Sequence, residues 1–126
     1  MDKSQAVYQF WSGFGVPAYD ENTAPDAKDI PSYPYITYTQ ATDALDAPVP
    51  LTANIWDRSI SWERVSKLAE QIARYVGEGG FRSIPIDGGY LLITQGHPFT
   101  QRMPDEADDM IRRVYIVTMA EFLTAY

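Results

Sequence analysis

The chain has 126 residues, no cysteine and a formal net charge of −7. The absence of cysteine excludes disulfides, thiol nucleophiles and thiolate zinc sites, and ten Lys and Arg against 17 Asp and Glu argue against a nucleic-acid grip. This length is typical of a single domain, 1–126, with one hydrophobic core.

A short helix is the first predicted element, in the opening segment MDKSQAVYQFWSGFG. Its apolar residues recur at helical spacing along one face and are Val7, Phe10, Trp11 and Phe14. Asp2 or Ser4 can cap the start of this helix, and Gly13 or Gly15 can end it.

The following segment, 16–34, contains four prolines and shows neither helical nor strand periodicity. Proline at this density excludes a helix or a central strand, so we expect an irregular connection. Such a long connection is either functional or a tolerated surface insertion, and the sequence leaves both open. A second irregular segment is expected at 95–109, QGHPFTQRMPDEADD.

Two strands are expected after the first irregular segment, YITYTQ at 35–40 and LTANIW at 51–56. Alternation in the second places Leu51 and Ile55 on one face and Trp56 on the opposite face. The polar stretch DRSIS then marks the point where the chain leaves the sheet and enters a helix.

That second helix is predicted over Ser61–Val76, with Ser61 as its cap and Gly77 at its end. An unbroken apolar stripe at helical spacing should cover the sheet, and it consists of Val65, Leu68, Ala69, Ile72 and Val76. Trp62, at the start of the helix, can pack over the rim of the sheet.

A hairpin is expected in RSIPIDGGYLLIT, with Gly88-Gly89 as its two-residue loop and Asp87 opposite Tyr90. Pro85 cannot donate to a strand ladder, which indicates an edge strand. The closing segment IRRVYIVTMAEFLTAY is apolar on both faces, which is typical of a long central strand. Its alternation places Arg112 and Arg113 on opposite faces.

The expected order is α-β-β-α-β-β-β. This order predicts an α+β fold with a mostly antiparallel sheet of four to five strands and two helices packed on one face. No apolar run reaches the roughly 18 residues of a membrane span, and MDKSQ is no signal peptide, so we expect a soluble intracellular protein.

No residue set indicates catalysis. His97 is the single histidine and has no cysteine partner, and its neighbours Gly96 and Pro98 favour a turn. An acidic run could ligate a hard cation but lacks EF-hand spacing, and it consists of Asp105, Glu106, Asp108 and Asp109. Arg112-Arg113 is most simply a local charge pair with that run. We therefore expect no enzyme, cofactor or metal site.

Aromatic residues on a sheet face without helices suggest an interaction surface. The alternative is that segment 16–34 folds back and buries them. The expected interface residues are Tyr19, Tyr33, Trp56, Phe99, Arg102, Asp105, Glu106 and Arg113.

Three segments carry a family resemblance: PYITY at 34–38, LTANIWDRSISWERVSKLAEQI from Leu51, and the closing RRVYIVTMAEFLTA. They resemble the tail terminator, or tail-completion (head–tail joining neck), proteins of long-tailed bacteriophages and prophages, and the likeness spans about 6–125. Sibling neck or minor tail proteins fit the same pattern.

The resemblance implies a ring, typically a homo-hexamer, that sits on the last ring of the tail tube. This ring ends tube polymerisation and offers a surface to the head–tail connector or stopper protein. DNA would pass through without specific binding. The implied location is the virion tail, with the host cytoplasm during assembly.

A rival hypothesis is a small ligand-binding or enzymatic α+β cone with an aromatic-lined pocket. Its lining would consist of Tyr35, Tyr38, Tyr90 and Tyr115, with His97 or Asp87 as base. A deep closed pocket around a buried carboxylate would favour this hypothesis, and a flat sheet face with protruding loops would favour the ring. A solitary stress or immunity-type binding module is a third possibility.

Overall fold

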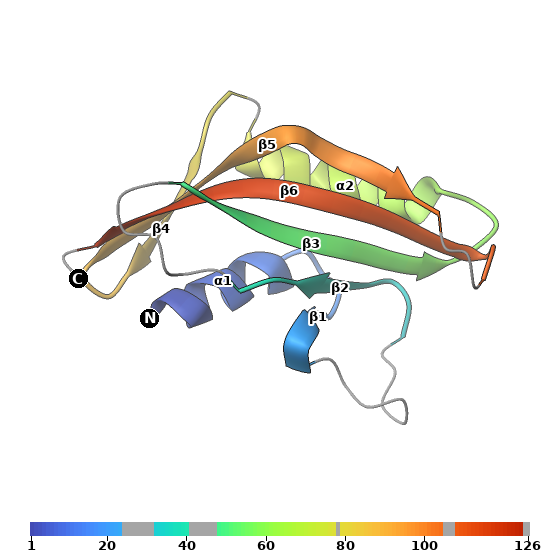
Figure 1. Ribbon diagram of the computed structural model, residues 1–126, viewed down its shortest axis with the longest axis horizontal. Helices are drawn as coiled ribbons and strands as arrows, with labels where there is room; N and C mark the ends of the chain where they lie inside the picture. Colours follow the sequence, from blue (N-terminus) through green and yellow to red (C-terminus); the bar gives the residue numbers. More distant parts are fainter. Residues whose placement is uncertain (24–31, 41–47, 78, 105–107, 125–126) are drawn as a thin grey trace.

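The computed structural model describes residues 1–23, 32–40, 48–77, 79–104 and 108–124. The elements in chain order are α1 (Lys3–Ser12), β1 (Ala18–Asp20), the 3-10 turn η1 (Glu21–Thr23), β2 (Tyr35–Tyr38), β3 (Val49–Arg58), α2 (Glu63–Val76), β4 (Arg82–Ile86), β5 (Gly89–Met103) and β6 (Ile111–Thr124). The predicted α+β class is confirmed (Figure 1). Neither described helix is long and apolar enough to span a membrane.

The strands form one six-stranded sheet in the order β1-β2-β3-β6-β5-β4. All neighbours are antiparallel except β1 and β2. The sheet therefore has more strands than the expected four to five, because Ala18–Asp20 forms a parallel edge strand inside the segment 16–34 that was predicted to be irregular. Three residues are too few to show a strand period, so the pairing comes from the neighbouring β2.

Strand β5 also extends further than predicted, from Gly89 to Met103, so the irregular segment expected at 95–109 is wrong over its first part. The β5–β6 register shifts between Gln95 and Thr100. This bulge accommodates Pro98, which has no N–H group to donate to the ladder, and pairing then resumes.

The β4–β5 hairpin differs from the prediction by a shift in register. Ile86 pairs with Gly89, so the turn is Asp87-Gly88 rather than Gly88-Gly89. Gly88 supplies the positive φ of 81° that the turn needs. Gly89 has another role, because a Cβ there would lie 1.8 Å from the carbonyl oxygen of Leu123 on β6. Strand β4 is an edge strand, as Pro85 indicated.

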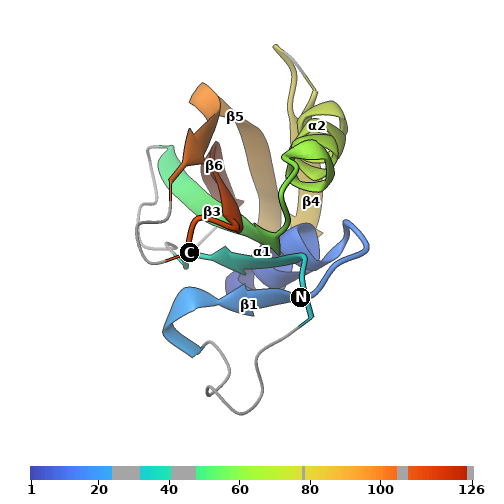
Figure 2. The same ribbon diagram turned by 90° about the vertical axis from the view of Figure 1, so that its right-hand side faces the viewer.

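Both helices lie on one face of the sheet, which bends around them (Figure 2). Helix α2 packs on β3, β5 and β6, while α1 contacts β1 and β4, the two edge strands. We call the covered side the inner face and the opposite side the outer face. The largest fully buried inner-face and helix side chains are Trp11, Ile36, Leu51, Ile55, Ile72, Leu91, Ile93, Ile116 and Phe122.

Each helix begins as its sequence indicates, with one shift. Asp2 caps α1 by accepting from the N–H of Gln5 at 2.8 Å, and Gln5 Oε1 accepts from the N–H of Asp2 at 3.0 Å. Helix α2 begins two residues later than expected, yet Ser61 Oγ still accepts from the N–H of Glu63 at 3.1 Å. All five residues of the predicted α2 stripe are buried.

A buried ion pair holds the joint between β3 and α2, where the strand pattern changes to a helical one. Asp57, the only fully buried carboxylate in the described chain, lies on the inner face at the end of β3. Arg64 in the first turn of α2 binds it with two bonds, Nε to Oδ2 at 3.0 Å and NH2 to Oδ1 at 2.6 Å. The two-pronged contact fixes the direction in which the helix returns over the sheet.

The stripe of α2 gives a direct stability prediction. Leu68 is 7% exposed, and Leu68→Ala should lower the free energy of unfolding by about 2–5 kcal/mol through lost burial and the cavity left behind. Urea unfolding measures the loss. Lys67→Ala, on the exposed side of the same turn, is the control and should cost less than about 1 kcal/mol. A similarly small loss in Leu68→Ala would contradict the packing described.

Candidate functional site: the outer face of the sheet

A row of aromatic rings crosses the outer face. Tyr35 on β2 and Trp56 on β3 are directly paired, and their rings stack with centroids 6.4 Å apart and planes at 19°. Tyr33 and Tyr19 also contact the Tyr35 ring, at 5.4 and 6.3 Å between centroids. All four side chains are half-buried. We call these four residues the aromatic row.

Arg113 on β6 extends the row across the next strand. Its guanidinium carbon lies 5.0 Å from the centre of the Trp56 ring, and its Nε donates to Asn54 Oδ1 at 2.7 Å. Trp56 Nε1 donates to Thr37 Oγ1 at 2.8 Å. The rings and the guanidinium are thus held in place by their neighbours before any partner binds.

Tyr35, which contacts the other three rings of the aromatic row, is a neutral phenol. Burial, and secondly the neighbouring Tyr33 phenol, raise the pKa of Tyr35 above its usual value. The hydroxyl therefore stays protonated at neutral pH. No carboxylate pairs with Arg113 in the part of the chain that the structure describes, so its outer N–H groups can donate to an anionic partner.

A second cluster lies on the inner side at the same end of the sheet. Trp62 is flanked by two guanidiniums, with the carbons of Arg102 and Arg112 at 4.8 and 5.3 Å from its rings. Arg112 donates to the carbonyl oxygens of Asp109 and Ile60, at 2.9 and 3.3 Å. The cluster joins β5, β6 and the start of α2.

The prediction that Arg112 and Arg113 lie on opposite faces is confirmed. Their expected role as a local charge pair with the acidic run differs from what the described residues show. There the partners of both arginines are indole rings, an amide and backbone carbonyls. Asp105 and Glu106 lie outside the described residues.

The predicted interface residues divide between the two faces. Tyr19, Tyr33, Trp56 and Arg113 come together on the outer face. Phe99 and Arg102 lie on the inner side instead, where they line a groove of about 280 Å³ between α2 and β5. Phe99 packs against the core, on the face where the alternation of Leu91, Ile93 and Gln95 along β5 also places it.

Sequence reasoning missed three contributors: Asn54, Trp62 as the centre of an arginine pair, and Tyr35 as the centre of the row. The roles of Asn54 and Tyr35 depend on cross-strand register, and that of Trp62 on the contact of the start of α2 with β5 and β6. The alternation within one strand gives neither. The one available sequence signal was alternation along β3, which places Asn54 and Arg58 on the same face as Trp56.

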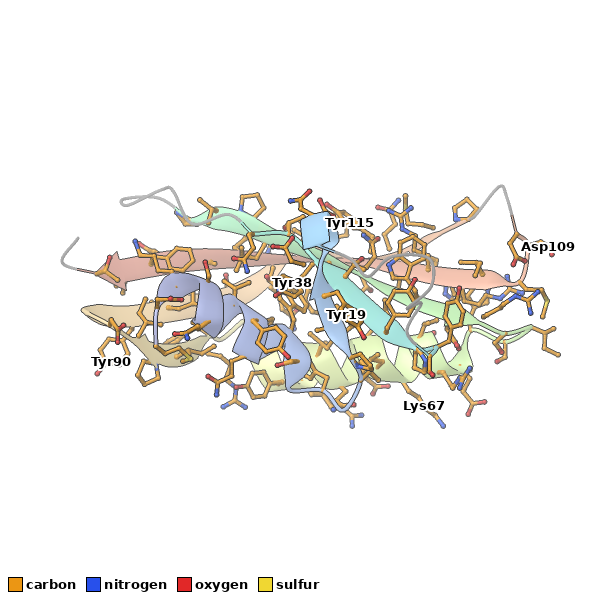
Figure 3. The ribbon with its side chains drawn as sticks, turned by 90° about the horizontal axis from the view of Figure 1, so that it is seen from below. Tyr19, Tyr38, Lys67, Tyr90, Asp109 and Tyr115 are labelled. Atoms are coloured by element: carbon orange, nitrogen blue, oxygen red, sulfur yellow. The ribbon has the colours of Figure 1, made fainter. Side chains whose placement is uncertain are left out.

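The residues of the rival pocket do not converge. Tyr38 is buried on the inner face, whereas Tyr35 and Tyr115 lie on the outer face. Tyr90 is exposed at one end of the molecule, away from Tyr19, Tyr38 and Tyr115 (Figure 3). His97 and Asp87 are both exposed and lie in separate segments, the β5 bulge and the hairpin turn.

The described residues hold no group of three His, Asp or Glu side chains that could bind a metal ion. What the outer face offers is contact area, fixed aromatic rings and one arginine, a composition suited to binding another chain. No protein-family model, curated protein or solved structure matches this chain.

Proposed function

We propose that this chain is a tail terminator, or tail-completion, protein of a long-tailed bacteriophage or prophage. As a homo-hexameric ring it binds the end of the tail tube, ends tube polymerisation and presents a surface to the head–tail connector. The resemblance of segments 34–38, 51–72 and 112–125 supports this proposal. The α+β order with both helices on one face agrees with it.

The observation that carries the proposal is the aromatic row with Arg113 on the outer face. Tyrosine, tryptophan and arginine dominate the energetics of protein interfaces, and rings already fixed by their neighbours lose little conformational entropy on binding. The proposed work is complementary binding with no chemical step. The net charge of −7 per chain suits a ring that DNA passes through without being held.

Purified protein mixed with polymerising tail tube protein tests the proposal by electron microscopy. We expect shorter tubes, each ending in a ring, because the bound ring removes the surface to which tube subunits add. Trp56→Ala should weaken this capping, whereas Tyr8→Ala, which removes an exposed aromatic of α1, should leave it unchanged. Tubes that elongate without limit and carry no ring would contradict the proposed function.

One observation favours the alternative of a small ligand-binding domain. A hollow of about 360 Å³ lies between α1, the end of α2 and β4. Phe10, Phe14, Tyr75 and Ile84 line it, together with Gln9 and Ser83. Its lining contains no acid, base or nucleophile pair, so it supports ligand binding rather than an enzymatic reaction.

A further inference from the structure

The outer face of β6 carries a stripe whose two ends have opposite charge. The stripe consists, in order along the strand, of Arg113, Tyr115, Val117, Met119 and Glu121. All five side chains are half-buried. Neither Arg113 nor Glu121 has an oppositely charged partner within the described ranges. We call these five residues the β6 stripe.

We propose that the outer face binds a second copy of this chain, in a two-fold dimer centred on Val117. Two-fold packing of the faces brings the two β6 strands together antiparallel. Arg113 of each copy then faces Glu121 of the other, since both lie four residues, or roughly 14 Å, from the centre. Tyr115 faces Met119 in the same way.

The strand on one side of β6 repeats this complementarity. The same rotation places β3 over its symmetry mate, since the axis runs across the strands. Trp56, paired with Arg113, then faces the region of Pro48, which lies beside Glu121. A ring over a proline is an apolar contact on both sides.

The strand on the other side of β6 is complementary as well. Met103 pairs with Arg113 and Leu92 with Glu121, so these two apolar residues face each other across the axis. Gln101 pairs with Tyr115 and Thr94 with Met119, so two polar side chains face each other. Across the axis, apolar side chains therefore face apolar ones, polar side chains face polar ones, and each charge faces the opposite charge.

Shape supports the same arrangement. A hollow of about 110 Å³ lies in the acidic half of the outer face, lined by Pro48, Phe81, Leu92, Thr94, Met119, Ala120 and Glu121. The rotation brings the partner copy's Tyr115 over Met119, at this hollow. An aromatic side chain entering a depression is the usual centre of a protein interface.

This inference goes beyond the proposed function and does not rest on it, because it concerns the free protein alone. The dimer would cover Trp56, so dimer formation and any contact of the aromatic row with another protein exclude each other. Binding to the tail tube would then require the dimer to separate, which would limit ring assembly away from the tube.

Sedimentation velocity of the purified protein tests the dimer. We expect a monomer–dimer equilibrium with a dissociation constant of about 1–100 µM. Arg113→Glu and Glu121→Arg should each weaken it at least tenfold, because each creates two like-charge contacts. Arg74→Glu and Glu70→Arg make the same charge changes on the exposed side of α2 and should leave the equilibrium unchanged.

Mixing the two variants separates the proposed contact from damage to the fold. A heterodimer of Arg113→Glu with Glu121→Arg restores opposite charges at both contacts, so the mixture should dimerise more tightly than either variant alone. The proposal would be overturned if the wild-type protein stays monomeric or forms a larger ring in place of a dimer. It would also be overturned if the mixture does not associate, or if the α2 control variants weaken the dimer as much as the β6 variants do.

Discussion

Arg64→Met should lower the free energy of unfolding by about 3 kcal/mol, because it leaves a buried carboxylate without its cation. Asp57 is 0% exposed, whereas the Arg64 side chain is 56% exposed. Once Arg64 is gone, the N–H of Arg58, at 2.9 Å from Asp57 Oδ1, is the remaining donor to that carboxylate that the structure describes. A single amide does not replace a two-pronged guanidinium.

The same pair predicts an asymmetry. Asp57→Asn should cost less than Arg64→Met, because the arginine that it leaves unpaired still reaches water. Urea unfolding of both variants at neutral pH measures the difference. Arg74→Met, which breaks an exposed pair with Glu70 on the same helix, is the control and should cost about 0.5 kcal/mol or less. A loss in Arg64→Met no larger than in this control would show that the joint does not depend on the buried pair.

The helices could be predicted because their signals are local. Asp2 and Gln5 are three residues apart and cap α1 without a contribution from any other element. The stripe from Val65 to Val76 repeats at the helical period. The central position of β6 followed from its two apolar faces. In each case the sequence within one element contains the whole signal.

The errors in the fold have tertiary causes. Strand β1 exists because its three residues pair with β2, not because of their own pattern. The hairpin register depends on Gly89, which must be glycine because the Leu123 carbonyl of β6 approaches it. Strand β5 continues past Pro98 because β6 offers partners on both sides of the bulge. None of these partners adjoins the segment it affects.

The sequence could predict on which face of the sheet a residue of the candidate site lies, but not which residues it contacts there. Alternation placed Trp56 away from the helices, and it placed Arg112 and Arg113 on opposite faces. The contact between Trp56 and Arg113 depends on the β3–β6 register, which joins residues far apart in the chain. Phe99 was expected at the interface because it lies in segment 95–109, which the sequence presents as irregular, whereas β5 continues through it and Phe99 packs against the core.

The proposed terminator function predicts that a phage deleted for this protein makes tails of irregular, excessive length, few of them joined to heads. Tube subunits add to an exposed end for as long as that binding is favourable. They stop only when another protein binds the same end more tightly, which is the role proposed for the ring. Electron microscopy of lysates measures both tail length and the fraction of tails joined to heads.

Complementation of that deletion then tests which surface does the work. Wild-type protein and His97→Gln should both restore tails of uniform length, because His97 is an exposed residue of the β5 bulge with no proposed role. Trp56→Ala should fail to restore them while keeping a cooperative thermal unfolding transition, since Trp56 is the centre of the outer-face contacts and is only half-buried.

Normal tails in the deletion strain would contradict the terminator function itself. Full rescue by Trp56→Ala would leave that function standing and move the interface away from the aromatic row, and a collapse with His97→Gln would favour the ligand-binding alternative.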